Sequence, residues 1–157
     1  MMKLLFTILL LISSIFASDL FKSENELVAN GKGVMFIFES NTCSYCDLLK
    51  KDFKENKEMN ELAKEFNIYL INREREVDYL VGEKKKKETT TTLRMAFAAK
   101  STPNIVIFDK HWNRIFQVPG YAHPAQMITF MKFVKGLHDG RYNTKEWKKF
   151  LKDNGVS

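Results

Sequence analysis

Four short apolar runs, each about as long as one β-strand, constrain the fold of this 157-residue chain most strongly. They are Val34–Phe38, Ile68–Ile71, Ile105–Phe108 and Ile115–Val118. The first three are hydrophobic throughout, which is typical of strands buried on both faces of a sheet. The last two are separated by only six residues, so they predict a hairpin.

Segments with helical spacing of apolar residues lie between and after these strands. Leu49 and Phe53 stand four residues apart and a second apolar series runs from Met59 to Phe66, with a break predicted near Asn56. Two further helices are predicted over Pro124–Lys135 and Thr144–Asp153. Strands that alternate with helices predict an α/β fold, here a three-layer α/β/α arrangement around a central mixed sheet.

Three segments have weaker patterns. Ser23–Asn30 is polar with some helical character, and Leu93–Lys100 predicts a helix that ends before Ser101. Between them, Arg73–Thr92 carries mixed charges, four consecutive lysines and four consecutive threonines. We interpret it as an irregular insertion.

The first residues are typical of a secretory signal peptide. Lys3 precedes an apolar stretch, Leu4–Ala17, and polar residues follow. This stretch has 14 residues, whereas a membrane-spanning helix needs about 20, so an anchor is disfavoured. We expect cleavage after Ala17, a single domain over residues 18–157, and export to the periplasm, where disulfides persist.

The net charge of +6 does not by itself identify a partner. The lysine run Lys84–Lys87 has no interleaved aromatic residue, so it predicts a solvated loop rather than a nucleic-acid site. Nucleic-acid binding would also be unusual for an exported protein. We expect a monomer that binds no nucleic acid.

The two cysteines, Cys43 and Cys46, follow the first predicted strand and precede a predicted helix. Free backbone N–H groups and the helix dipole favour an anion at a helix N-terminus, so a thiolate is stabilised there. Cys43 is nearer the helix end and is the candidate nucleophile. Cys46 lies one turn further in, where it can attack a mixed disulfide formed by Cys43.

A structural disulfide, a zinc site and a pair of unrelated free thiols are weaker interpretations of these cysteines. A purely structural disulfide would close a very small loop, where the stabilising effect is least. A zinc site would need two more ligands, and His111, His123 and His138 lack paired ligand spacing. We therefore expect redox chemistry at Cys43 and Cys46, with no metal and no cofactor.

The chain resembles the thioredoxin superfamily over nearly its whole mature length. The resemblance rests on the strand Val34–Phe38, the motif Cys43-Ser44-Tyr45-Cys46, the pair Thr102-Pro103 before a strand, and Gly120 after the hairpin. It implies that Pro103 is a cis-proline beside the cysteine pair. It also implies that the backbone of Thr102 pairs with an incoming substrate strand.

More narrowly, the chain looks like bacterial periplasmic thioredoxin-like proteins of the SoxW and thioredoxin-related type. Glu39 before the motif, the Cys-x-Tyr-Cys pattern, Gly120-Tyr121 and Gly140-Arg141-Tyr142 carry this likeness. Tyr45 would either line a substrate groove or be a simple exposed side chain.

Two residues depart from the cytosolic thioredoxin pattern. Thr42 stands where those proteins have Trp, and Ile37 stands where they have a buried Asp that handles protons. Glu39, a carboxylate four residues before Cys43, is the possible proton acceptor for Cys46. Alternatively, Glu39 simply ends the strand in solvent.

We therefore expect a periplasmic thiol–disulfide oxidoreductase that reduces protein disulfides. A membrane thiol reductase would be its electron donor, because the two cysteines cannot regenerate their own dithiol. An oxidant that donates its disulfide is the rival enzyme. A thioredoxin-fold binding module or chaperone with incidental cysteines is the rival without enzymatic activity.

Overall fold

The structure is a computed structural model that describes residues 19–156, so the predicted signal peptide lies outside the described residues. The strands are β1 (Phe21–Lys22), β2 (Glu26–Leu27), β3 (Gly33–Glu39), β4 (Phe66–Asn72), β5 (Asp78–Val81), β6 (Lys86–Thr89), β7 (Asn104–Phe108) and β8 (Arg114–Pro119). The helices are α1 (Ser44–Glu55), α2 (Lys57–Ala63), α3 (Thr90–Ala96), α4 (Pro124–His138) and α5 (Trp147–Asp153), with a 3₁₀ turn, η1 (Thr144–Glu146), before α5.

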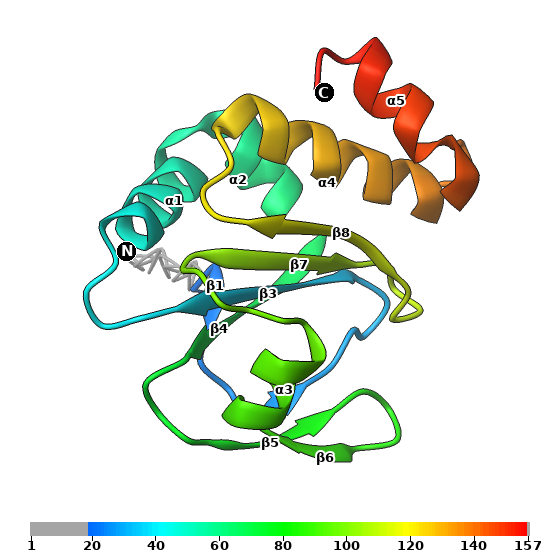
Figure 1. The fold of residues 1–157 in the computed structure, drawn as a ribbon. Helices are drawn as coiled ribbons and strands as arrows, with labels where there is room; N and C mark the ends of the chain where they lie inside the picture. The colour runs from blue at the N-terminus through cyan, green and yellow to red at the C-terminus, as the bar shows by residue number, and fades with distance from the viewer. Residues whose placement is uncertain (1–18, 157) are drawn as a thin grey trace, which may run out of the picture.

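A five-stranded mixed sheet forms the centre of the molecule, in the order β1-β4-β3-β7-β8 (Figure 1). Strands β1, β4 and β3 run parallel, whereas β7 and β8 run antiparallel to their neighbours. The β7–β8 pair is the predicted hairpin. The predicted α/β class with a central mixed sheet flanked by helices is confirmed.

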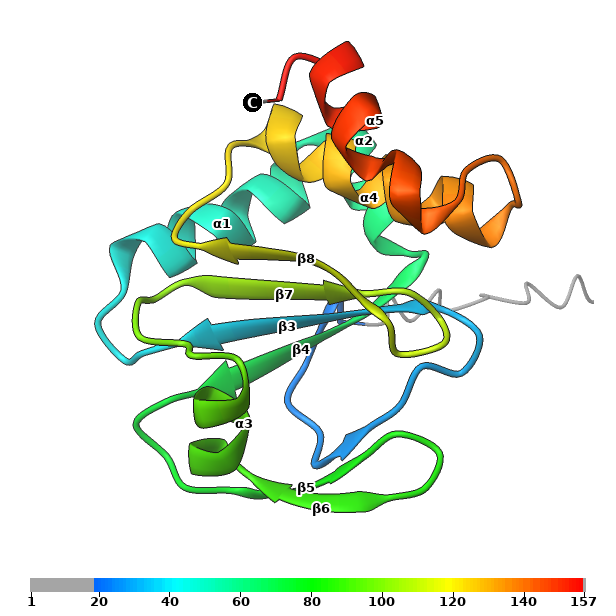
Figure 2. The same cartoon turned by 45° about the vertical axis from the view of Figure 1, so that its right-hand side comes forward.

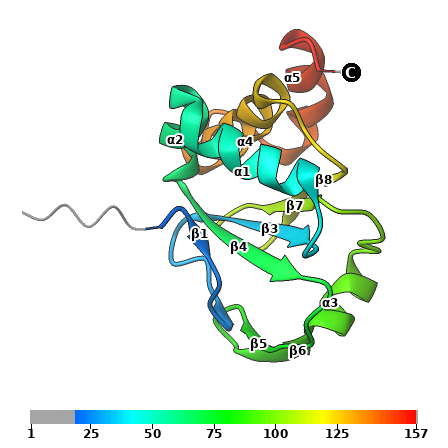
Figure 3. The same ribbon diagram turned by 90° about the vertical axis from the view of Figure 1, so that its left-hand side faces the viewer.

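Alternate residues of the central strand β3 enter two separate hydrophobic cores. Met35 and Ile37 pack among residues of α1, α2 and α4, and Phe36 and Phe38 pack in the opposite core. Figure 3 shows these three helices on one side of the sheet and α3 with β5 and β6 on the other. Because both faces are covered, β3 is apolar at each inner position, which is why its sequence reads as an unbroken hydrophobic run.

The interpretation of Arg73–Thr92 as an irregular insertion is wrong. The segment contains β5 and β6, which form a small sheet with β2 in the order β2-β5-β6, and it contains the start of α3 (Figure 2). Helix α3 begins at Thr90 rather than near Leu93, because Thr89 and Thr92 bond reciprocally to each other's backbone N–H groups in a capping box. It ends at Ala96, before the predicted Lys100.

The helical character predicted for Ser23–Asn30 is also wrong. This segment contains the short strand β2, and side chains of β4 hold it extended. The Asn67 amide donates to the carbonyls of Val28 and Ala29, and the Tyr69 hydroxyl bonds to the backbone of Val28. These hydrogen bonds between residues distant in the sequence outweigh the local preference of the segment for a helix.

The helix boundaries next to the site agree with the sequence. Asn56 separates α1 from α2 and caps α2, accepting a hydrogen bond from the backbone N–H of Met59 at 3.0 Å. Helix α4 covers the predicted segment from Pro124 and continues three residues beyond Lys135. Within residues 19–156 the structure contains no helix of the length and hydrophobicity that a membrane span requires.

Candidate active site at the start of helix α1

The structure joins Cys43 and Cys46 in a disulfide, with an S–S distance of 2.06 Å and a Cα–Cα distance of 5.2 Å. Strand β3 leads into the pair, and Cys43 is the N-cap of α1. The exposed fraction is 9% for Cys43 and 1% for Cys46. Cys43 is therefore the more accessible of the two, in the order that the sequence predicts.

The sulfur of Cys43 occupies the position where the helix offers free donors. The backbone N–H of Cys46 lies 3.2 Å from Cys43 Sγ and donates to it. A thiolate at this position receives that hydrogen bond together with the positive end of the helix dipole. This arrangement stabilises the anionic form of Cys43, which is the nucleophilic form of a thiol.

The loop that contains Thr102 and Pro103 lies beside the loop that leads to Cys43. Phe38 is paired with Asn104 in the β3–β7 ladder, so the two loops leave the sheet at the same edge. The hydroxyl oxygens of Ser40 and Thr102 are 3.2 Å apart and share a hydrogen bond. The Thr102–Pro103 peptide bond is cis.

The backbone of Thr102 is available to a ligand. Among residues 19–156, no backbone or side-chain group forms a hydrogen bond with the N–H or C=O of Thr102. An extended peptide that lies along this loop could form backbone hydrogen bonds with both groups, as an added strand does at the edge of a sheet.

Glu39 is the last residue of β3 and forms an ion pair with a lysine of α1. Its carboxylate lies 3.0 Å from Lys50 Nζ, and Lys50 also lies 3.3 Å from Asp47. Burial acts to lower the pKa of Lys50, but hydrogen bonding and charge attraction from Glu39 and Asp47 outweigh it and raise that pKa. Lys50 therefore stays cationic and holds the Glu39 carboxylate in place.

Glu39 also has a route to solvent. Its side chain has an exposed fraction of 16% and lines a polar cavity of about 270 Å³. Ser23, Asn25 and Asn72 line the same cavity. A proton that reaches Glu39 can leave through this cavity without crossing the apolar core.

Aromatic side chains form a rim beside the cysteine pair. Tyr45 has an exposed fraction of 59%, and its ring centroid is 5.7 Å from that of Tyr121, which is 5.1 Å from the ring of His123. The Tyr121 hydroxyl donates to the carboxylate of Asp52 in α1. Burial, together with this carboxylate, raises the pKa of Tyr121 to about 12. Tyr121 therefore ties the loop after β8 to the helix that carries the cysteines.

Sequence reasoning noted Tyr121 only beside Gly120 and missed its bond to Asp52. It also missed a polar network at the start of the Arg73–Thr92 segment. The Glu74 carboxylate accepts the backbone N–H of Asn41 at 2.8 Å, and the Arg73 guanidinium donates to the carbonyl of Lys100 at 2.6 Å. These bonds fix the loops on both sides of the cysteine pair.

Two of the three histidines make contacts that belong to the fold. His138 accepts the backbone N–H of Lys110 at 2.9 Å through Nε2, and His123 lies against Tyr121. Over residues 19–156, no three His, Cys, Asp or Glu side chains are grouped as a metal site requires.

Comparison with known proteins places this geometry in a family. The family model for a thioredoxin-like domain matches residues 20–135. A thioredoxin-fold protein from Helicobacter pylori is 29% identical, with a TM-score of 0.74 over 87% of this chain and 92% of that chain. A thioredoxin from Thermus thermophilus is 16% identical, with a TM-score of 0.50 over 76% and 91% of the two chains. Comparison with curated proteins gives no match. The chain belongs to the thioredoxin-like domain family.

Proposed function

We propose that this protein is an exported thiol–disulfide oxidoreductase that reduces protein disulfides. The observation that carries the proposal is the position of Cys43, whose sulfur caps α1 and accepts the backbone N–H of Cys46. The family match and the disulfide between the two cysteines support redox chemistry at this site. The apolar stretch before Ala17 supports export to the periplasm.

The reaction begins with the dithiol form. The Cys43 thiolate attacks one sulfur of a substrate disulfide, and the other substrate sulfur leaves as a thiolate that takes up a proton. Cys46 then loses its proton and attacks Cys43, which releases the second substrate sulfur as a thiol. The products are the Cys43–Cys46 disulfide seen in the structure and a substrate reduced by two electrons.

Glu39 is the proposed acceptor of the Cys46 proton. It is held by Lys50 at 3.0 Å, and its cavity connects it to solvent. A carboxylate in this place serves the same purpose as the acidic residue that is absent at Ile37. Mutation of Glu39 should therefore affect the second step, in which Cys46 attacks, and leave the first step unchanged.

Thr102 and Tyr45 are the proposed substrate contacts. The unpaired backbone of Thr102 would bind an extended segment of the substrate, and the exposed ring of Tyr45 would pack against the substrate. The chain contains only two cysteines, so an external dithiol must restore it after each turnover. A membrane thiol reductase is the donor that we propose.

A disulfide-reduction assay with single-cysteine variants tests the proposal. The native protein should reduce a disulfide-bonded peptide when a chemical dithiol is supplied, and the Cys43→Ser variant should not. The Cys46→Ser variant should accumulate a covalent mixed disulfide with the peptide, detectable by mass spectrometry. Equal activity of the native protein and Cys43→Ser would instead favour a binding module or chaperone.

The reduction potential decides the direction of the reaction. A reductase should have a value near the thioredoxin figure of about −270 mV, and an oxidant should lie near about −120 mV. Equilibration with glutathione or dithiothreitol buffers, followed by alkylation and mass analysis, gives the value. A potential at the oxidising end would overturn the reductase assignment while leaving the redox chemistry in place.

A further inference from the structure

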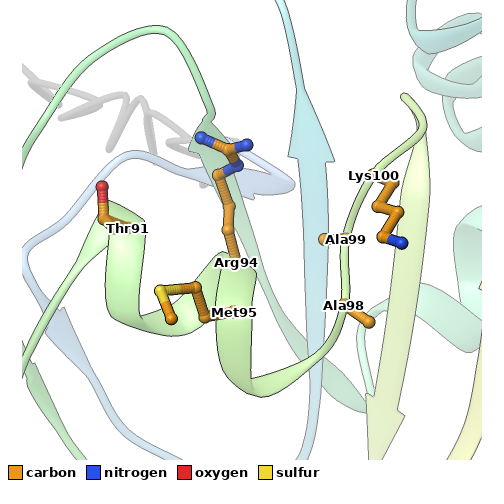
Figure 4. Close-up of a pocket in the computed structure, with 6 residues that line it drawn as sticks. All are labelled: Thr91, Arg94, Met95, Ala98, Ala99 and Lys100. Carbon is orange, nitrogen blue, oxygen red and sulfur yellow. The ribbon is translucent and has the colours of Figure 1, made fainter.

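An open groove lies between helix α3 and the loop that follows it. Its volume is about 370 Å³, within the range of ligand-binding clefts. The residues that line it are Thr91, Arg94, Met95, Ala98, Ala99 and Lys100. Figure 4 shows Arg94 on the helix and Lys100 on the loop, on the two sides of the groove. We refer to these six residues as the α3 groove.

The α3 groove lies close to the candidate active site along the chain. Lys100, at one wall, is two residues before Thr102, so at most about 7 Å of extended chain separates them. The hydroxyl of Thr102 shares a hydrogen bond with the hydroxyl of Ser40, which lies in the loop that leads to Cys43. A polypeptide that pairs with Thr102 would therefore continue into the groove within a few residues.

The wall formed by Lys100 is held in place from outside. The Arg73 guanidinium donates to the Lys100 carbonyl at 2.6 Å, and the carbonyl of Glu39 accepts the backbone N–H of Arg73 at 2.9 Å. The groove thus keeps a fixed position relative to β3 and the cysteine pair. A fixed position is what a second contact with the same substrate requires.

The groove has cationic groups without partners. Within residues 19–156, neither Arg94 nor Lys100 forms an ion pair, although many other lysines do. The guanidinium of Arg94 makes no hydrogen bond in the same range, and its Nε atom is buried. Because the Arg94 guanidinium has no partner in this range, a carboxylate that enters the groove can pair with it.

One carboxylate lies near these cations. Glu76 bonds to the hydroxyl of Thr91 at 2.8 Å, and its pKa is lowered by hydrogen bonds from threonines, with a smaller effect from Arg94. Glu76 is hydrogen-bonded to Thr91 and offsets part of the charge of Arg94, while the charge of Lys100 has no ion-pair partner among residues 19–156. The groove therefore keeps a net positive charge.

Besides Thr91, the rest of the α3 groove is apolar. Met95 has an exposed fraction of 76%, and Ala98 and Ala99 complete the surface. An exposed methionine is a flexible apolar contact that adapts to different side chains. The groove therefore combines an adaptable apolar surface with two flanking cations.

We propose that the α3 groove binds the polypeptide next to the substrate's disulfide and selects acidic residues there. This inference rests on the proposed function, because it assigns a substrate class to the same site. An aspartate or glutamate a few residues from the reacting cysteine would pair with Arg94 and Lys100. An apolar residue beside it would contact Met95.

The test compares three disulfide-bonded peptides that differ only beside one cysteine. That position carries two glutamates, two glutamines or two lysines. We expect kcat/KM to be about three- to tenfold higher for the glutamate peptide than for the lysine peptide, with the glutamine peptide between them. Raising the salt concentration should reduce this ratio.

The double variant Arg94→Gln with Lys100→Gln should remove the preference, so that the three peptides react with similar kcat/KM. Its matched control is Lys84→Gln with Lys87→Gln, which removes the same charge from exposed lysines of the turn between β5 and β6 and of β6, and should keep the preference. Equal kcat/KM of the native protein for the three peptides would overturn the proposal. So would an equal loss of the preference in the double variant and in its control. Thermal unfolding of each variant checks that the fold is retained.

A binding measurement separates this inference from the proposed function. Versions of the peptides with serine in place of cysteine cannot react, so fluorescence anisotropy reports binding separately from disulfide reduction. Tighter binding of the glutamate version to the native protein, lost in the Arg94→Gln and Lys100→Gln variant, supports the groove even if no peptide is reduced. Equal binding of all three versions contradicts it even if every peptide is reduced.

Discussion

Replacing Tyr121 with Phe isolates the bond between the loop after β8 and helix α1. The substitution keeps the ring and removes one hydroxyl, which donates to the carboxylate of Asp52. A hydrogen bond to a charged group contributes about 1.5–3 kcal/mol to stability. Because the half-buried Asp52 regains some hydration in the variant, we expect the free energy of unfolding to fall by about 1–2 kcal/mol. With about 2 cal/mol/K per residue of unfolding entropy over a domain of this size, the melting temperature should fall by about 3–7 °C.

The stabilisation that the Tyr121 hydroxyl provides should depend on pH. The pKa of Tyr121 is raised to about 12, chiefly by burial and then by Asp52, whereas an unfolded tyrosine titrates near 10. The stabilisation is therefore complete below about pH 10 and is lost as the pH rises toward 12. The difference between native protein and Tyr121→Phe should be constant from pH 7 to 9 and shrink above pH 10.

Thermal unfolding followed by circular dichroism measures both effects. Tyr45→Phe is the matched control, since the Tyr45 hydroxyl makes no hydrogen bond within the described part of the chain and its removal should change the melting temperature by less than about 1 °C, as expected for surface sites. The reasoning fails if Tyr121→Phe melts with the native protein, or if its difference from native is the same at pH 7 and pH 11.

Three further predictions concern the helical face and the proton path. His138 accepts the N–H of Lys110, and burial lowers the pKa of its imidazole, so the stability it contributes is complete above pH 6.5 and is lost as the pH falls. In denaturant titrations the free energy of unfolding of His138→Gln should therefore fall less steeply below pH 6.5 than that of the native protein. An equal fall in both proteins would contradict this. Gly136→Ala places a methyl group against the ring of Tyr142 and should cost about 1–3 kcal/mol in urea unfolding, with an unchanged midpoint as the contrary result. Glu39→Gln should slow resolution of the mixed disulfide at least about tenfold at neutral pH in stopped-flow assays, and an unchanged resolution rate would remove Glu39 from the mechanism.

The inner strands of the central sheet were predictable because burial on two faces leaves a direct record in the sequence. Strands β3 and β7 are covered by helices on one side and by α3 and the small sheet on the other, so both are continuous apolar runs. The cysteine pair was predictable for a related reason. Its position at a strand–helix junction is a local feature, readable from the residues on either side.

The small sheet was not predictable from local patterns. Strand β6 lies at its edge, and Lys86 and Lys87 are exposed there, as is common where an edge strand must avoid pairing with other chains. In β5 the side chain of Tyr79 is the one that is buried. A single buried side chain is too few to show the alternation of buried and exposed residues that marks a strand. A polar strand of four residues therefore has the composition of a loop.

The supporting contacts of the site were missed for a different reason. Glu74 bonds to Asn41 across 33 residues of sequence, and Tyr121 bonds to Asp52 across 69. A single polar residue has no periodicity, and its partner is set by the fold of the whole domain. Such contacts become visible only when the sheet has brought the loops together.

The proposed chemistry depends on a thiolate of Cys43 that the start of α1 stabilises. In the reduced Cys46→Ser variant, Cys43 is the only thiol, and its ionisation can be followed by absorbance at 240 nm across pH 3 to 10. The backbone N–H groups and the helix dipole should bring its pKa into the range of about 3.5–7.5. A pKa at or above the ordinary value of about 8.5 would contradict the account.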